Sequence, residues 1–331
     1  MRSPAWCRRR LGLLLPLWMK VKVPMSILVV GAGATGGYFG GRLAQAGRDV
    51  TFLVRERRAA ALKERGLRIA GPGGTDVIEP RLVTSVPSGA VADVVLVTVK
   101  ADGLGAVIPE IRSAVGPGTA IVPVLNGMRH MGMLNAAFGR SRVLGGVAVL
   151  STQLDDNGDV RQLNDLASLT FGDQDGQRTQ VVERAGGQLS GAGFPASASD
   201  NIMAAMWQKW AFIASVGALN CLLGGSVGEV VAVDGGDEIA RGIVAETSSV
   251  TGAAGYPLSD AALRQITAML TAPGSSFTSS LYRDLREGKP VEVETILGDL
   301  VAEGRKAGVR TPLLDAATVA LRVHNAAVSA A

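Results

Sequence analysis

The segment MSILVVGAGATGGYFGGRLAQAG, residues 25–47, most constrains what this chain can fold into. A short apolar run leads into three glycines spaced G-x-G-x-x-G, and a helix-like segment follows. Between a buried strand and a helix, this spacing is typical of a turn that binds a dinucleotide pyrophosphate. The glycines permit the tight turn, the approach of phosphate to the backbone and close helix packing. We therefore expect the cofactor-binding turn to comprise Gly31, Ala32, Gly33, Ala34, Thr35 and Gly36.

Short apolar runs alternate with longer amphipathic segments from residue 26 to about 151, which indicates a parallel sheet covered by helices. The predicted strands are 26–30, 49–54, 93–99, 119–125 and 142–150. The Gly/Pro cluster within residues 66–85 predicts a small hairpin, and Asn157-Gly158 predicts a second one at the sheet edge. These features favour a doubly wound, Rossmann-like α/β domain over residues 26–199.

Helical periodicity dominates after residue 200. We expect helices at 201–219, 226–233, 237–252, 259–270, 277–286, 291–306 and 311–327. At 331 residues the chain exceeds the roughly 250 to 300 at which single cores stop growing. The sequence thus predicts an all-helical second domain over residues 200–331.

The net charge of +4 comes from the first 25 residues, which hold six basic and no acidic side chains. The rest of the chain has 27 basic and 29 acidic residues, so we expect no nucleic-acid partner. The tail's apolar run is far shorter than the ~20 residues that span a bilayer, which argues against a membrane anchor. We expect a disordered extension or a misassigned start before Met25, and a secretory signal is the weaker alternative.

Two cysteines and two histidines leave no disulfide framework and no expected metal site. This composition favours a cytoplasmic protein. We interpret Cys221 as core packing. His130 is expected on the surface, with a place along a cleft as the alternative.

The second predicted strand ends at Arg55, where an enzyme that uses NAD usually has an acid for the ribose hydroxyls. A guanidinium there suits a 2′-phosphate, so Arg55 favours NADPH/NADP+. The alternatives are that Arg55 is an ordinary solvated charge and that Glu56 serves the ribose of NAD.

Lys209 lies between Trp207 and Trp210 on a strongly apolar predicted helix. A lone ammonium there is costly unless it has a partner or a task, so Lys209 is the candidate proton donor to a carbonyl substrate. The alternative is a lysine that extends to the surface.

Five further motifs follow the fingerprint in order: VTVKADG, LNGM, MWQKW, SSLYRDLREGKPVEVETILGDLV and GVRTPLL. In this order the chain resembles ketopantoate reductases (2-dehydropantoate 2-reductases) from Ser26 to the last helix. The resemblance implies a C-terminal domain like that of 6-phosphogluconate dehydrogenase, and NADPH-dependent reduction of 2-dehydropantoate to (R)-pantoate in pantothenate and coenzyme A biosynthesis.

The resemblance also implies roles for individual residues. Lys209 corresponds to the catalytic lysine, and Glu292 to the acid that partners the lysine and the substrate. Ser280 corresponds to a substrate-binding serine. Asn126 corresponds to the asparagine near nicotinamide and substrate, and Lys100 to a lysine at the cofactor cleft. Arg55 corresponds to the arginine that faces the 2′-phosphate.

Three positions depart from the family pattern. Ile213, Gly217 and Phe277 stand where family members often have asparagine. Their loss predicts a more apolar pocket, so a branched or bulkier 2-oxo acid is an alternative substrate. The alternative functions are a dehydrogenase of the 3-hydroxyisobutyrate type and a non-catalytic NADP-binding regulator. The sequence does not determine the oligomeric state, and a homodimer is compatible with it.

Overall fold

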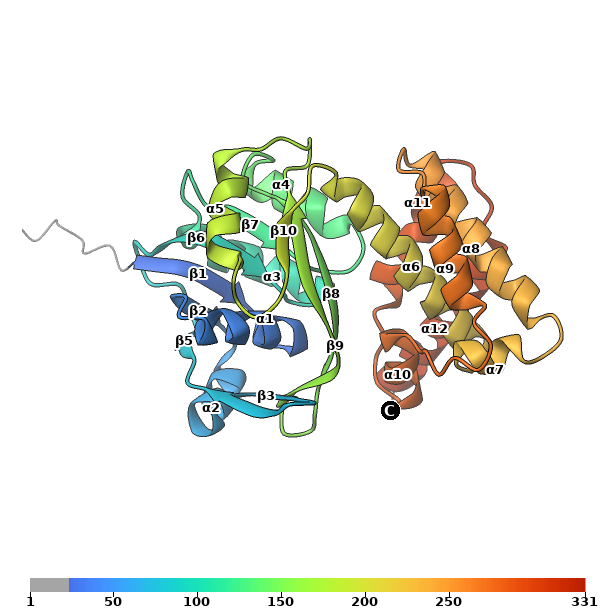
Figure 1. Cartoon of the computed structure of the whole chain (residues 1–331), viewed down its shortest axis with the longest axis horizontal. Helices are drawn as coiled ribbons and strands as arrows, with labels where there is room; N and C mark the ends of the chain where they lie inside the picture. Colours follow the sequence, from blue (N-terminus) through green and yellow to red (C-terminus); the bar gives the residue numbers. More distant parts are fainter. Residues whose placement is uncertain (1–23, 331) are drawn as a thin grey trace, which may run out of the picture.

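The computed structural model describes residues 24–330, so the predictions for residues 1–23 lie outside the described part. Figure 1 shows a sheet-containing N-terminal part beside a wholly helical C-terminal part, joined by α6 (Ile202–Leu223). This α/β architecture with an all-helical second part is the predicted fold class.

The first sheet is parallel throughout. Its strands are β1 (Pro24–Val30), β2 (Val50–Leu53), β5 (Arg81–Val83), β6 (Val91–Val97) and β7 (Ala120–Pro123), in the order β5-β2-β1-β6-β7. This is the doubly wound order, in which the chain changes direction between β1 and β6.

Helices cover both faces of the parallel sheet, which explains why its strands are apolar without interruption. Ile27 and Val29 pack against one face's helices, which are α1 (Ala34–Gln45), α2 (Glu56–Arg65) and α5 (Gln180–Leu189). Leu28 and Val30 point the other way, toward α3 (Ala101–Ile111) and α4 (Arg129–Phe138). A short 3-10 turn, η1 (Arg112–Ala114), continues α3.

A second, mixed sheet lies on the other side of α1. It contains β3 (Leu67–Gly71), β4 (Gly74–Ile78), β8 (Gly145–Leu154), β9 (Val160–Gly172) and β10 (Ala196–Ala198). The predicted hairpin within residues 66–85 is confirmed as the antiparallel pair β3–β4. The Asn157-Gly158 hairpin is also confirmed, but β8 and β9 form part of this separate sheet and not the edge of the parallel one.

The assignment of residues 142–150 to the parallel sheet was wrong. Val143 makes a single parallel bridge to Ile121, after which the chain leaves that sheet as β8. A Cβ on Gly146 would lie 2.1 Å from the carbonyl oxygen of Pro123, so the glycine permits the close crossing that takes β8 away. The fifth parallel strand is instead the short β5.

The C-terminal part is helical, as predicted. Around α6 lie α7 (Val227–Val231), α8 (Gly236–Ala253), α9 (Asp260–Leu270), α10 (Ser280–Arg286), the π-helical η2 (Glu294–Gly298), α11 (Asp299–Lys306) and α12 (Pro312–Ala330). The single helix predicted at 291–306 is thus a π-helical turn followed by α11. Within the described residues α6 has the length and apolarity of a membrane span, but it is mostly buried as a core helix.

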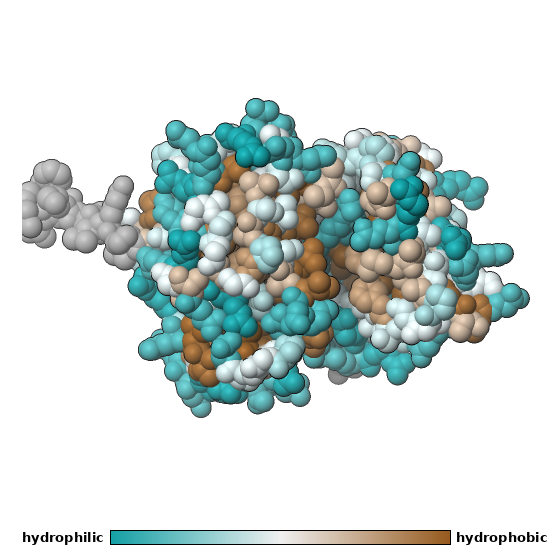
Figure 2. All heavy atoms as spheres, viewed as in Figure 1, coloured by the Kyte–Doolittle hydropathy of each residue, from teal (hydrophilic) through white to brown (hydrophobic). Residues whose placement is uncertain are grey.

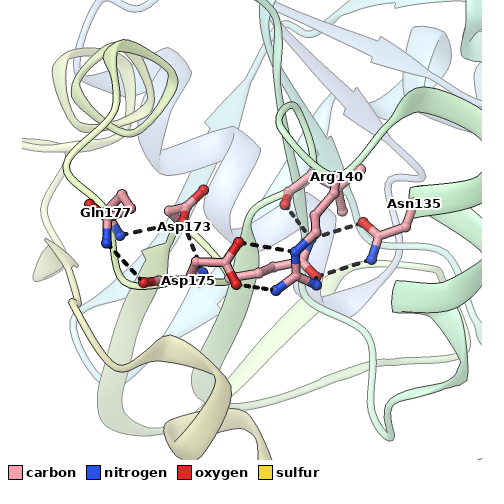
Figure 3. A network of polar contacts seen from close by, with 7 residues as sticks. Asn135, Arg140, Asp173, Asp175 and Gln177 are labelled. Atoms are coloured by element: carbon pink, nitrogen blue, oxygen red, sulfur yellow. Dashed lines mark hydrogen bonds and ion pairs between the residues drawn. The ribbon is translucent and has the colours of Figure 1, made fainter.

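A polar network fixes the end of α4 to the loop between β9 and α5 (Figure 3). Arg140 donates two hydrogen bonds to Asp175, at 3.1 and 2.6 Å. Asn135 and Gln174 exchange amide hydrogen bonds, and Gln174 also donates to the Val143 carbonyl. The network therefore holds the end of α4 and the start of β8 against the β9–α5 loop.

Candidate active site

The carboxyl ends of β1, β6 and β7 meet at one edge of the parallel sheet, where doubly wound folds bind their ligands. The glycine turn follows β1, Lys100 follows β6 and Asn126 follows β7. The topology therefore brings three predicted site segments to the same edge, at the switch point between β1 and β6.

Each of the three glycines has its own structural reason. Gly31 has φ +96°, a conformation that side chains other than glycine rarely adopt. A Cβ on Gly36 would lie 2.1 Å from the Gly31 carbonyl oxygen, so this position must lack a side chain for α1 to pack. A Cβ on Gly33 would meet nothing within 4 Å. Packing therefore does not require Gly33, and its backbone faces open space.

The start of α1 fits an anion. Gly33 is the N-cap and offers no side-chain hydrogen bond, and the first turn has no acidic residue. The first N–H groups of a helix have no partner within the helix, and the helix dipole adds partial positive charge there. The residues present thus suit the pyrophosphate of a dinucleotide.

Arg55 is the N-cap residue of α2, directly beyond β2. It is exposed, and its side chain makes no hydrogen bond or ion pair with another described residue. Its guanidinium extends toward α3, since a Cβ on Gly103 would lie 4.0 Å from the Arg55 Nη2. By contrast Arg58 is engaged, donating from Nε to the Ala32 carbonyl at 3.0 Å. Arg55 thus remains available to an external anion.

Figure 2 shows a groove between the N-terminal and the helical parts of the molecule, called the crevice below. Lys100 and Glu292 come from these two parts and interact electrostatically. Lys100 caps α3, whereas Glu292 precedes η2 in the helical part. Burial raises the pKa of Glu292, while the charge of Lys100 and a hydrogen bond from the Ala101 N–H lower it. Asp284 of α10 belongs to the same cluster, because burial raises its pKa and Lys100 opposes that rise.

Lys209, on α6, shares a narrow pocket with Asn126 and Gly127. The pocket has about 10 Å³ of space, room for about one water molecule, and its other lining residues are Leu125, Gly146, Val147, Met206, Trp210 and Ile213. Trp210 is fixed by a hydrogen bond from its indole N–H to the Ile296 carbonyl. The structure thus places Lys209 beside Asn126.

The surroundings of Lys209 disfavour its charge. Its side chain is only partly exposed, and burial lowers its pKa to about 8. Among the described residues it makes no ion pair, and Glu292 interacts with Lys100 instead. A cation in such a site shifts readily between charged and neutral forms near physiological pH.

Two family models match the chain. Residues 27–176 match "Ketopantoate reductase PanE/ApbA", and residues 201–325 match "Ketopantoate reductase PanE/ApbA C terminal". The chain belongs to the ketopantoate reductase family. This family is a family of oxidoreductases.

Similar proteins can be aligned with nearly the whole length of this chain. An uncharacterized oxidoreductase, YkpB of Bacillus subtilis, is 32% identical over 302 residues, which is 91% of this chain and 99% of that protein. The crystal structure of 2-dehydropantoate 2-reductase from Geobacter metallireducens is 27% identical, with a TM-score of 0.80, covering 90% of this chain and 99% of that one.

The same fold occurs in a D-mandelate dehydrogenase solved as a ternary structure with NADH and anilino(oxo)acetate. It has a TM-score of 0.82 and 22% identity, and covers 92% of this chain and 99% of that one. At this identity the likeness concerns the fold alone.

The three positions at which the sequence departs from the expected pattern, Ile213, Gly217 and Phe277, contribute no polar side-chain atom. Ile213 lines the Lys209 pocket, one turn further along α6. A Cβ on Gly217 would lie 2.7 Å from Leu281 Cδ1, so an asparagine there would collide with Leu281. Phe277 stacks on Phe212 with ring centroids 5.9 Å apart.

The remaining candidates lie apart from the Lys209 pocket or deep beneath the surface. Ser280 is exposed at the start of α10 and does not line that pocket. Cys221 is a buried free cysteine whose pKa burial raises to about 12, as expected for core packing. The expectation that His130 lies on the surface was wrong, because it is 3% exposed. Its position one residue into α4 gave no periodic signal from which burial could be predicted.

Proposed function

We propose that this chain is a cytoplasmic, NADPH-dependent reductase of a 2-oxo acid, with 2-dehydropantoate reduced to (R)-pantoate as the first reaction to test. The observation that carries the proposal is Lys209, an ammonium that has no ion-pair partner among residues 24–330 and shares an apolar pocket with Asn126. This pocket and the open glycine turn both adjoin the carboxyl edge of the parallel sheet.

The residues of the glycine turn and Arg55 would hold the cofactor, which when bound supplies a hydride to the carbonyl carbon. Lys209 gives a proton from Nζ to the carbonyl oxygen, and its charge stabilises the negative charge that develops there. Asn126 orients the substrate from the N-terminal side of the pocket. Glu292 and Ser280 bind the substrate from the helical part of the molecule. Because Ser280 does not line the Lys209 pocket, this requires the helical part to move toward the bound substrate.

Arg55 should determine the choice between NADPH and NADH. Loss of the guanidinium removes a charge-assisted contact to a 2′-phosphate, worth about 1.5 to 3 kcal/mol. We expect Arg55→Ala to lower kcat/KM for NADPH at least tenfold and to leave that for NADH nearly unchanged. Steady-state kinetics with both cofactors tests this, with Arg57→Ala as the matched control. An unchanged NADPH/NADH ratio would refute the role and leave Glu56 as the ribose ligand.

The substrate is identified by NADPH consumption with 2-dehydropantoate and a panel of other 2-oxo acids, branched and aromatic ones included. The apolar side chain that Ile213 contributes to the lining of the Lys209 pocket supports activity with the bulkier members. We expect Ile213→Asn to shift the kcat/KM ratio toward 2-dehydropantoate by a factor of about 2 to 10, since a buried hydrogen bond contributes about 0.5 to 1.5 kcal/mol.

A protein that binds NADPH but oxidises it with none of these acids would contradict the proposed function. That outcome would favour a non-catalytic NADP-binding regulator. Binding is followed by the change in NADPH fluorescence, so that loss of binding and loss of turnover are distinguished. Ile213→Val serves as the apolar control, for which we expect the panel's rank order to stay the same.

A further inference from the structure

His130 carries a buried imidazole. Both ring nitrogens are buried, and neither makes a hydrogen bond within residues 24–330. Burying polar groups without hydrogen bonds is costly, and each such group in a native fold calls for a physical explanation. The chain's other histidine, His324, has its Nε2 2.9 Å from the Lys289 carbonyl oxygen. His130 therefore differs from an ordinarily satisfied histidine.

The position of His130 connects it to the Lys209 pocket. It lies in the first turn of α4, directly after the loop in which Asn126 and Gly127 line that pocket. A Cβ on Gly127 would lie 2.5 Å from the Thr295 carbonyl oxygen, so this loop is pressed against η2. Met128, between the loop and His130, packs against the hydrophobic cores of both parts of the molecule. His130 thus lies where the two parts meet.

Charge at His130 is strongly disfavoured. Burial, and to a smaller extent the charge of Lys209, lower its pKa to about 4. The positive end of the α4 dipole acts in the same sense. At neutral pH the imidazole is neutral, with one nitrogen able to accept a hydrogen bond and the other able to donate one.

The other charged groups near this junction are engaged elsewhere. Arg129 of α4 forms an ion pair with Asp299, and Glu294 of η2 pairs with Arg322 at 2.7 Å. Lys209 itself has three N–H donors and, within the described part of the chain, no hydrogen-bond acceptor. A neutral imidazole that can accept a hydrogen bond thus lies within electrostatic reach of an ammonium that can donate one.

We propose that His130 is a positioning residue for Lys209: its neutral ring accepts a hydrogen bond from the ammonium when the crevice holds its ligands. This inference rests on the proposed function, in which a second Lys209 N–H points at the carbonyl oxygen of a 2-oxo acid. Asn126 Oδ1 can take the third N–H. The imidazole would direct Nζ into the pocket and stabilise its protonated form without introducing a competing negative charge.

The kinetic test compares His130→Leu, which removes the acceptor, with His130→Gln, which keeps an amide acceptor. For His130→Leu we expect kcat to fall at least tenfold, KM for NADPH to stay within a factor of two or so, and the basic limb of the kcat profile to move to lower pH. The limb moves because the ammonium loses its acceptor. His130→Gln should recover most of kcat and of the limb. Equal losses in both variants, or an unmoved limb, would overturn the proposal.

A second measurement does not depend on turnover. In a His324→Asn background the imidazole nitrogen NMR resonances belong to His130 alone, and the protein is studied with NADP+ and oxamate, an unreactive 2-oxo acid analogue. We expect these resonances to remain those of a neutral ring and to shift as Lys209 loses its proton. The shift should be absent in Lys209→Met.

Resonances that do not respond to that titration would overturn the role of His130 even in an active enzyme. If no 2-oxo acid is turned over, the proposed function fails, whereas the NMR result still decides whether His130 holds Lys209. The two failures are therefore distinguishable.

Discussion

Replacing Lys209 by methionine is expected to lower kcat/KM for the preferred 2-oxo acid by about 100-fold or more. A positioned proton donor contributes about 10²- to 10⁴-fold, and a cation at the developing oxyanion adds to this. Methionine matches lysine in length and apolar bulk but carries neither the proton nor the charge. Steady-state kinetics at saturating NADPH measures the effect, and a loss below about fivefold would remove Lys209 from the proposed role.

The pH dependence follows from the same residue. Burial lowers the pKa of Lys209 to about 8, and the proton donor must be protonated. The rate should therefore hold below that pH and fall as the pH rises through about 8. Lys209→Arg should abolish this basic limb, because a guanidinium keeps its proton throughout this range. A wild-type limb that persisted in Lys209→Arg would assign the titration to another group.

A stability measurement separates loss of function from loss of fold. The pKa of Lys209 falls from 10.5 to about 8 on folding. Below about pH 8 the folded state therefore contains a buried charge that lowers the free energy of unfolding. Between these two values the unfolded chain binds more protons, and stability rises with pH. Lys209→Met should thus be more stable than wild type at neutral pH, on the order of 1 to 3 kcal/mol, with the gain vanishing at high pH. Thermal unfolding at two pH values checks the sign.

Two glycines of the same turn should respond oppositely to one added methyl group. Gly33→Ala is expected to leave thermal stability nearly unchanged and to weaken NADPH binding at least tenfold. The added carbon meets no protein atom within 4 Å but intrudes on the space left for the pyrophosphate. Gly36→Ala is expected to destabilise the fold severely, since its Cβ would lie 2.1 Å from the Gly31 carbonyl oxygen and 2.2 Å from Thr98 Oγ1.

Calorimetry or thermal unfolding combined with NADPH titration distinguishes the two variants, and each serves as the other's control. Unchanged NADPH affinity in Gly33→Ala would show that no phosphate lies against this turn. The proposed cofactor site would then have to move, even if the ketopantoate reductase fold remained. Retained stability in Gly36→Ala would indicate that α1 shifts away from the strand without cost.

The sequence predicts those parts of the fold that local physical chemistry determines. The G-x-G-x-x-G turn is predictable because glycine serves a different purpose at each position. Gly31 has a positive φ, Gly36 lets α1 pack closely, and Gly33 leaves space open beside the backbone. The short continuous apolar run from Ile27 to Val30 predicts a strand buried on both faces, and the structure confirms it. The helices after residue 200 were readable from their periodicity and caps, such as the Ser226 capping box at α7.

Features that depend on distant contacts were not predictable. The apolar pattern of β8 suits either sheet, and only the close crossing of Gly146 over Pro123 sends it to the second one. Burial of His130 depends on distant parts of the chain, since Ile202 and Met206 of α6 belong to the same core cluster as Met131 of α4. The resemblance implies that Glu292 partners Lys209, but residue order does not reveal that the charge of Lys100 acts on Glu292.

The most direct test of the account is a crystal structure of the full chain with NADP+ and oxamate bound. We predict Lys209 Nζ at hydrogen-bond distance, roughly 2.7 to 3.2 Å, from the oxamate oxygen that replaces the ketone, with the nicotinamide C4 facing the adjacent carbon. An Nζ directed into bulk water, with the analogue held by other groups, would contradict the account.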